Sequence, residues 1–147
     1  MGFALPAAMG EKVAAPHKQV VAVIGDGGYQ MTVQELGTIM QYKIPVKILV
    51  LNNSFLGMVR QWQQLFHGKR YSFTEMQNPN FVKIAEAYNI PAAKVTEQKN
   101  LEAELKKMLA SETSYFLEVV VEKEDNVFPM VPAGAGVAEV ILEIPKH

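Results

Sequence analysis

Short apolar segments that alternate with helix-like segments constrain the fold of this chain more than any other feature. Residues 19–24, 47–51 and 115–121 are apolar at nearly every position, and residues 92–95 form a shorter segment of the same kind. Such runs, bounded by turn residues, are typical of strands that a sheet buries on both faces. We therefore predict strands at these places.

The segments between these runs carry helical patterns. Residues 32–42 have apolar side chains at helical spacing, and Thr32 with Glu35 matches the pattern of a capping box. Residues 78–89 begin with an Asn-Pro pair, which predicts a capped helix with proline in its first turn. A third pattern, over residues 100–109, follows the shorter strand candidate. Strand and helix therefore alternate.

This alternation predicts an α/β fold in three α/β/α layers, with a mainly parallel sheet joined by right-handed crossovers. A chain of 147 residues, 49% apolar and 20% charged, suits a single globular domain, so we expect one domain over residues 1–147. Residues 129–136 are rich in proline and glycine and predict an irregular surface segment.

Charge and composition narrow the classes of function. A net charge of −1 without a basic stripe argues against nucleic acid as a partner. No apolar run approaches the roughly 20 residues that span a bilayer, so we expect no membrane contact and a cytoplasmic location. The absence of cysteine excludes disulfides, cysteine-zinc sites and thiol nucleophiles.

Polar residues follow two of the predicted strands where each ends. Gly25, Asp26, Gly27 and Gly28 close the first strand, and Asn52-Asn53 closes the second. In a parallel sheet both ends emerge at one edge, where ligands gather. A carboxylate and a carboxamide suit Mg²⁺, and the flanking glycines let a phosphate approach the backbone. Taken alone, each segment is better explained as a tight turn, and it is the placement of both at strand ends that favours a binding site.

Gly25-Asp26-Gly27, a spacer over residues 28–51, and then Asn52-Asn53 resembles the thiamine-diphosphate motif of the decarboxylase and synthase superfamily. The resemblance implies that Asp26, Asn53 and the main-chain carbonyl of Phe55 hold Mg²⁺. It also implies that the glycines of residues 25–28 face the diphosphate of the cofactor.

A narrower resemblance is to the acetolactate (acetohydroxyacid) synthases. It implies that Met1 supports the bent cofactor, that Gly57 and Met58 line it, and that Trp62 lines the substrate channel. By spacing alone, Met58 and Trp62 belong to the apolar face of an amphipathic helix. The segments that carry this likeness are residues 1–8, 56–66, 78–81 and 129–131.

The synthase resemblance implies decarboxylation of pyruvate and transfer of its two-carbon unit to a second 2-ketoacid. The product would be acetolactate or acetohydroxybutyrate, in branched-chain amino-acid biosynthesis. In that family an activating glutamate comes from another domain on a partner chain, a middle domain binds FAD, and a regulatory small subunit occurs. We therefore expect a C-terminal fragment of a three-domain enzyme with no catalytic residue of its own, and no synthase activity from the isolated chain.

Two alternatives remain open from the sequence. The chain could belong to another thiamine-diphosphate decarboxylase or oxidase, although the Gln61-Trp62-Gln63 context argues against this. It could also be a non-catalytic, flavodoxin-like module that binds a phosphorylated ligand.

Overall fold

The computed structural model describes residues 1–123 and 125–143, which form two compact units. The first, here called the sheet unit, comprises Met1–Ser54 and Gln77–Val121. The second, here called the α4 unit, comprises Phe55–Met76 and the described residues from Glu122 onward.

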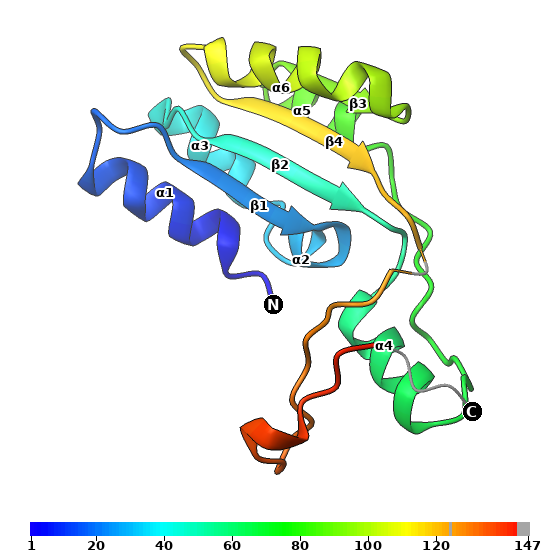
Figure 1. Ribbon diagram of the computed structural model, residues 1–147. Helices are drawn as coiled ribbons and strands as arrows, with labels where there is room; N and C mark the ends of the chain where they lie inside the picture. Colours follow the sequence, from blue (N-terminus) through cyan, green and yellow to red (C-terminus); the bar gives the residue numbers. More distant parts are fainter. Residues whose placement is uncertain (124, 144–147) are drawn as a thin grey trace. The chain divides into compact units, whose positions relative to one another are not determined.

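The sheet unit is built on four parallel strands in the order β1-β2-β4-β3, and the arrowheads of β1, β2 and β4 point the same way in Figure 1. All four predicted strands are present, and no strand begins or ends more than two residues from its predicted position. The strands are β1 (Val21–Gly25), β2 (Lys47–Asn52), β3 (Ala92–Val95) and β4 (Tyr115–Val120).

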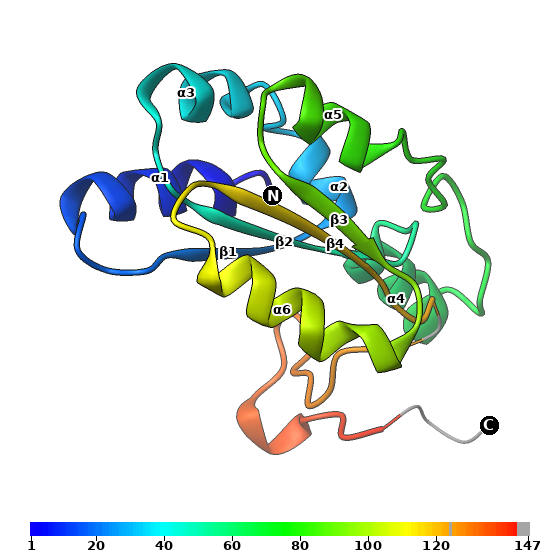
Figure 2. The same ribbon diagram turned by 90° about the horizontal axis from the view of Figure 1, so that it is seen from above.

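Helices cover both faces of this sheet, which confirms the predicted three layers (Figure 2). Four helices pack on one face and α6 packs on the other. The connection from β3 to β4 runs back across the sheet, and a right-handed crossover in that direction places its helix on the opposite face. The helices are α1 (Ala4–Ala14), α2 (Asp26–Gln30), α3 (Glu35–Tyr42), α5 (Phe81–Ala87) and α6 (Leu101–Ala110), with a 3₁₀ turn, η1 (Gln98–Asn100), before α6.

Two hydrophobic clusters lie on opposite faces of the sheet, and successive side chains along a strand belong alternately to one and to the other. Ile24, Ile48 and Phe116 face the four-helix layer, and Leu117 with Met108 belongs to the cluster under α6. The expectation of burial on both faces is wrong for β1. Its Val21 and Val23 are 38% and 55% exposed, because α6 packs over β3 and β4 and no helix of the sheet unit covers that side of β1.

The helix starts differ from the sequence prediction. Helix α3 begins at Glu35, and the hydroxyl of Thr32 is buried without a hydrogen bond, so the predicted capping box does not form. Helix α5 begins at Phe81, and its N-cap is Asn80, whose side chain accepts a hydrogen bond from the amide of Lys83. Helix α1, which no periodicity indicated, packs against β1.

The α4 unit contains helix α4 (Gly57–Phe66) and a 3₁₀ turn, η2 (Val137–Glu139). The buried residues of α4 are Arg60 and Gln61, not its apolar side chains. Gln61 is buried because its carboxamide pairs with the main chain of Val127, at 3.0 Å and 2.8 Å. The apolar side chains of α4 that are exposed instead are Met58, Val59 and Phe66.

The segment predicted to be irregular, residues 129–136, lies in the α4 unit and contains no helix or strand. Met130 nevertheless pairs with Ile141 in an isolated antiparallel bridge. Among the residues described here, no helix has both the length and the apolar character needed to cross a membrane.

Candidate functional site

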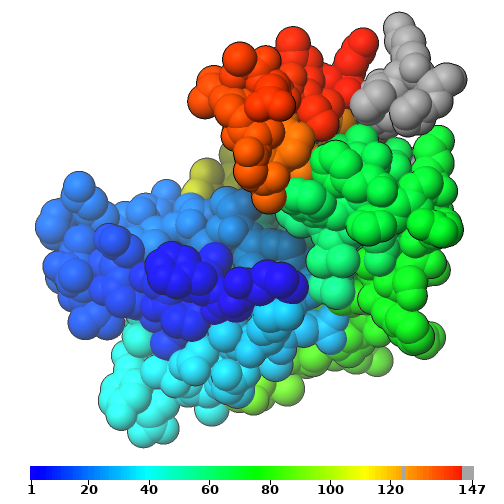
Figure 3. Space-filling model, turned by 90° about the horizontal axis from the view of Figure 1, so that it is seen from below, coloured from blue at the N-terminus to red at the C-terminus, as the bar shows by residue number. Residues whose placement is uncertain are grey.

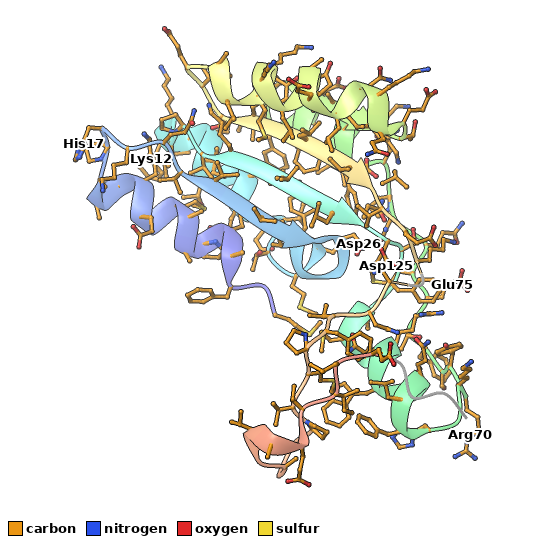
Figure 4. The ribbon with its side chains drawn as sticks, in the orientation of Figure 1. Lys12, His17, Asp26, Arg70, Glu75 and Asp125 are labelled. Atoms are coloured by element: carbon orange, nitrogen blue, oxygen red, sulfur yellow. The ribbon has the colours of Figure 1, made fainter. Side chains whose placement is uncertain are left out.

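The register of β1 and β2 brings Asp26 and Asn52 together. Gly25 pairs with Leu51, so Asp26, the first residue after β1, lies level with Asn52, the last residue of β2. Figure 4 shows Asp26 at the end of β1. Both side chains are buried, at 1% and 6% exposure. The two strand ends therefore lie at one edge of the sheet, as predicted, and Asp26 shares two hydrogen-bond donors with Asn52.

The backbone just after β2 supplies the first of these donors. The amide of Ser54 donates to Asp26 Oδ2 at 2.9 Å and to Asn52 Oδ1 at 3.0 Å. Ser54 has a φ of 58°, in the left-handed region that non-glycine residues seldom adopt. Such conformations persist where the surroundings hold them, and they cluster at functional sites.

Asn78 supplies the second donor. Its Nδ2 lies 2.7 Å from Asp26 Oδ2 and 2.9 Å from Asn52 Oδ1. Its Oδ1 accepts a hydrogen bond of 2.8 Å from Gln30 Nε2, which fixes the orientation of the carboxamide. Sequence reasoning missed this role because it treated the Asn-Pro pair as a helix start. The helix cap is Asn80, which leaves Asn78 available to the site.

Behind Asn52 lies an ion pair between the buried Glu118 and Lys94, whose side chain is 46% exposed. Asn52 Nδ2 donates to Glu118 Oε1 at 2.7 Å, and Lys94 Nζ reaches the same oxygen at 2.8 Å. Glu118 is only 2% exposed, so this lysine and this amide compensate its burial. A continuous polar network therefore runs from β3 through β4 and β2 to Asp26.

The glycines beside Asp26 have different surroundings. Gly25 has φ −73° and ψ 155°, which any residue adopts, and no atom of the described chain lies within 4 Å of a Cβ built there. Neither backbone strain nor internal packing therefore requires glycine at this position. Gly27 is buried, and a Cβ on Gly28 would lie 3.4 Å from Ile24.

The N-terminus lies beside these glycines. The main-chain nitrogen of Gly2 is 4.0 Å from the position that a Cβ on Gly28 would take. Gly2 itself has φ +75°, and a Cβ on it would lie 3.2 Å from Met31 and from Thr32. Figure 3 shows the dark-blue N-terminal residues on the surface beside the light-blue chain that follows β1. Met1, which is 79% exposed, directly precedes Gly2 and therefore lies near Gly28.

The donor set suits one kind of cation. Within residues 1–123 and 125–143, no group of three or more His, Cys, Asp or Glu could hold a metal. A metal at Asp26 would therefore need other ligands as well, such as amide or carbonyl oxygens, waters or the phosphates of a ligand. That is the usual environment of Mg²⁺, which keeps waters and cofactor phosphates in its octahedron. Asn53, half-buried, follows Asn52 directly in the chain.

The other predicted site residues belong to the α4 unit. Phe55 forms an isolated bridge with Glu75, and its ring centroid lies 5.0 Å from the guanidinium carbon of Arg60. Gly57 begins α4, and Met58 is 49% exposed.

Trp62 lines a pocket of the α4 unit. This pocket has a volume of about 400 Å³, and its lining residues are Val59, Trp62, Gln63, His67 and Arg70. Trp62 is half-buried there. A concave site of this size, with an indole, a cation and a carboxamide in its wall, falls within the range of small-molecule pockets. The assignment of Trp62 to substrate stays a prediction.

The sheet is parallel and has helices on both faces. At its carboxyl edge lies a buried carboxylate, next to a glycine with unfilled space around its Cα. These features are those of a domain that binds a phosphorylated cofactor. Residues 1–119 match the family described as thiamine pyrophosphate enzyme, C-terminal TPP binding domain, and the chain belongs to this family. Thiamine pyrophosphate, or TPP, is the same compound as thiamine diphosphate.

Individual relatives agree with this family. The chain is 47% identical to the mitochondrial acetolactate synthase of Schizosaccharomyces pombe over 142 residues, which cover 97% of this chain and 21% of that protein. It is also 47% identical to the acetolactate synthase isozyme 2 large subunit of Escherichia coli, covering 96% of this chain and 26% of that one. The chain thus spans about a quarter of the length of these relatives.

A solved structure agrees with the fold. The thiamine diphosphate-dependent 4-hydroxybenzoylformate decarboxylase of Rhodococcus jostii superposes with a TM-score of 0.79 at 31% identity, over 86% of this chain and 24% of that chain. The thiamine-diphosphate-binding fold predicted from the sequence is therefore confirmed.

Proposed function

We propose that this TPP-binding domain holds the diphosphate of the cofactor through Mg²⁺ at the carboxyl edge of β1 and β2. The observation that supports this most is Asp26. It is 1% exposed, it follows a glycine with open space above it, and two N–H donors fix one of its carboxylate oxygens. A carboxylate is not buried at such an edge without compensating partners. A cation completes that compensation.

In this proposal Asp26, the carboxamide of Asn53 and the main-chain carbonyl of Phe55 are the protein ligands of the metal. Gly25, together with Gly27 and Gly28, lets the diphosphate approach the backbone, because a side chain at Gly25 would occupy the open space.

The residues proposed to line the cofactor lie before and after the segment 25–53 in the sequence. Met1 supports the cofactor from the N-terminal side, Gly57 and Met58 line it, and Trp62 contacts the substrate. The exposure of Met1 and Met58, 79% and 49%, is consistent with surfaces that a bound molecule or another protein part would cover. No residue of this chain is proposed as a catalytic acid or base.

As part of a whole enzyme, the domain would serve an acetolactate synthase, as the 47% identity to such enzymes supports. Bound TPP supplies the carbanion chemistry by which pyruvate loses CO₂ and its two-carbon unit joins a second 2-ketoacid. The remaining domains, a second catalytic chain with the activating glutamate, FAD in the middle domain and a regulatory small subunit belong to the same proposal. A cytoplasmic location stays a prediction, since some relatives are mitochondrial by name.

Calorimetry of TPP binding with and without Mg²⁺ tests the metal site. The unmodified chain should bind TPP in a Mg²⁺-dependent manner, and Asp26→Ala should lose that dependence because it removes the carboxylate of the site. Glu86→Ala, which removes an exposed carboxylate of α5, is the matched control and should bind normally. Equal affinity of Asp26→Ala and the unmodified chain would refute the assignment.

A thiamine-diphosphate decarboxylase is the second candidate, and the similarity to the Rhodococcus enzyme favours it. A chimera distinguishes the two. This chain replaces the matching segment of the E. coli acetolactate synthase relative, and the product formed from pyruvate is identified. Acetolactate supports the synthase, with the Asp26→Ala chimera as the inactive control. Release of acetaldehyde without acetolactate would support the decarboxylase.

A further inference from the structure

Asn78 makes contacts that the proposed ligand set does not explain. It lies 52 residues from Asp26 in the sequence, on the segment that precedes α5. Its Nδ2 nevertheless donates both to Oδ2 of Asp26 and to Oδ1 of Asn52, at the carboxyl edge of the sheet. We propose that Asn78 is a positioning residue, which holds Asp26 in the orientation that Mg²⁺ requires. This inference rests on the proposed function of Asp26 as the metal-binding carboxylate.

The geometry explains how one carboxamide does this. The hydrogen bonds from Asn78 Nδ2 and from the amide of Ser54 both go to Oδ2 of Asp26, at 2.7 Å and 2.9 Å. The carboxylate is therefore held against rotation about its terminal bond, and Oδ1 is the oxygen left for a cation. Residues that orient a metal ligand in this manner contribute strongly to metal affinity.

The clamp is itself anchored on two sides. Gln30 fixes Oδ1 of Asn78, so that Nδ2 points to the site. Asn52, whose Oδ1 also accepts from Nδ2 of Asn78, is fixed in turn because its own Nδ2 donates to Glu118. Lys94 holds that Glu118 carboxylate in place. Asn78 is the only side-chain donor to Asp26 among the hydrogen bonds of the described residues, because the other donor is the backbone of Ser54.

The metals themselves give a readout that distinguishes positioning from general damage. Mg²⁺ demands near-ideal octahedral geometry at about 2.0–2.1 Å, whereas Ca²⁺ accepts flexible coordination at about 2.3–2.6 Å. A loosened carboxylate should therefore weaken Mg²⁺ binding more than Ca²⁺ binding. A substitution that merely lowered the folded fraction of the protein would lower the affinities for both ions by the same factor.

The experiment measures the apparent affinity of Mg²⁺ and, separately, of Ca²⁺ by titrating each ion into the chain with saturating TPP. Asn78→Ala should lower Mg²⁺ affinity about tenfold or more, in the range seen when such supporting residues are changed, and Ca²⁺ affinity by a clearly smaller factor. Gln30→Ala, at an exposed position, should shift both affinities in the same sense but less.

Asn80→Ala is the matched control. It changes the same residue type in the same segment and removes the N-cap of α5, but Asn80 makes no hydrogen bond to Asp26. It should leave the ratio of Mg²⁺ to Ca²⁺ affinity unchanged. Circular dichroism verifies that each variant is folded, and Gln30→Ala carries the test if Asn78→Ala does not fold.

The outcomes separate this inference from the proposed function. If the unmodified chain and Asp26→Ala bind TPP equally well with and without Mg²⁺, the metal site itself is refuted, and the role of Asn78 with it. If Asp26→Ala loses the Mg²⁺ dependence but Asn78→Ala or Gln30→Ala keeps the unmodified ratio of the two affinities, only the positioning role is refuted.

Discussion

The hydroxyl of Tyr29 gives the sharpest test of the packing of the sheet unit. Tyr29 is 0% exposed, and its oxygen is buried without a hydrogen-bond partner in the described chain. The ring itself is well packed, since its centroid lies 5.2 Å from those of Phe81 and Phe116. We predict that Tyr29→Phe stabilises the protein.

The magnitude follows from two opposing contributions. An unsatisfied buried polar group costs about 1–3 kcal/mol. Removing the oxygen also removes its dispersion contacts and leaves a small void, which offsets part of that gain. The ring contacts with Phe81 and Phe116 are kept. The net expectation is a gain of about 1 kcal/mol in the free energy of unfolding at pH 7, measured by urea denaturation.

The pH dependence adds an independent signature. Burial, with a smaller contribution from Tyr88, raises the pKa of Tyr29 well above its usual value. The unfolded chain therefore releases this proton from about pH 10 upward while the folded chain retains it, so stability falls with pH at up to about 1.4 kcal/mol per pH unit. Tyr29→Phe has no such proton, and its advantage should widen above pH 10.

The matched control is Tyr42→Phe, because Tyr42 is 73% exposed. It should change neither the stability at neutral pH nor the alkaline loss. Comparing each variant with the unmodified chain cancels the other groups that titrate there, such as Tyr115 and Lys47. A Tyr29→Phe variant that is less stable than the unmodified chain, or equally sensitive above pH 10, would refute the reasoning.

Two further predictions concern the site. Gly25→Ala should leave the unfolding free energy of the cofactor-free chain unchanged or raise it by up to about 1 kcal/mol, as scanning calorimetry would measure. TPP affinity should nevertheless fall about tenfold or more, because the methyl group enters the cradle; unaltered affinity would contradict this. Lys94→Met should destabilise the chain by about 2 kcal/mol in urea denaturation, because the buried Glu118 then keeps only the amide of Asn52 as a hydrogen-bond partner among the described residues. Adding Glu118→Leu should recover part of that loss, and equal losses in the single and double variants would contradict the ion-pair account.

The sequence predicts the sheet well because buried parallel strands have a local signature. Continuous apolar runs such as residues 47–51 need no knowledge of their neighbours to be identified, and β2 covers Lys47–Asn52. The failure at β1 has the opposite cause. Val21 and Val23 are as apolar as the residues of β2, but exposure depends on which strand α6 covers, and this is a property of the topology.

Helix termini were less predictable because several residues compete for one role. Thr32 and Glu35 fit a capping box in sequence, but the chain continues in turns until Glu35, and the hydroxyl of Thr32 ends up buried. Two asparagines precede α5, and only geometry decides which one caps it. The backbone of Asn80 is extended, with φ −74° and ψ 97°, as an N-cap requires.

The same competition explains why only part of the candidate site could be predicted from the sequence. Asp26 and Asn52 are local signals, since each terminates a strand, and the parallel register guarantees that they meet. Asn78 carries no comparable signal, because its neighbours in the sequence describe a helix start and its partners lie 26 and 52 residues away. A capping asparagine bonds its own helix, so its partner lies two or three residues further along the sequence. A positioning asparagine bonds whatever the fold brings near, and its spacing is therefore set by the whole domain.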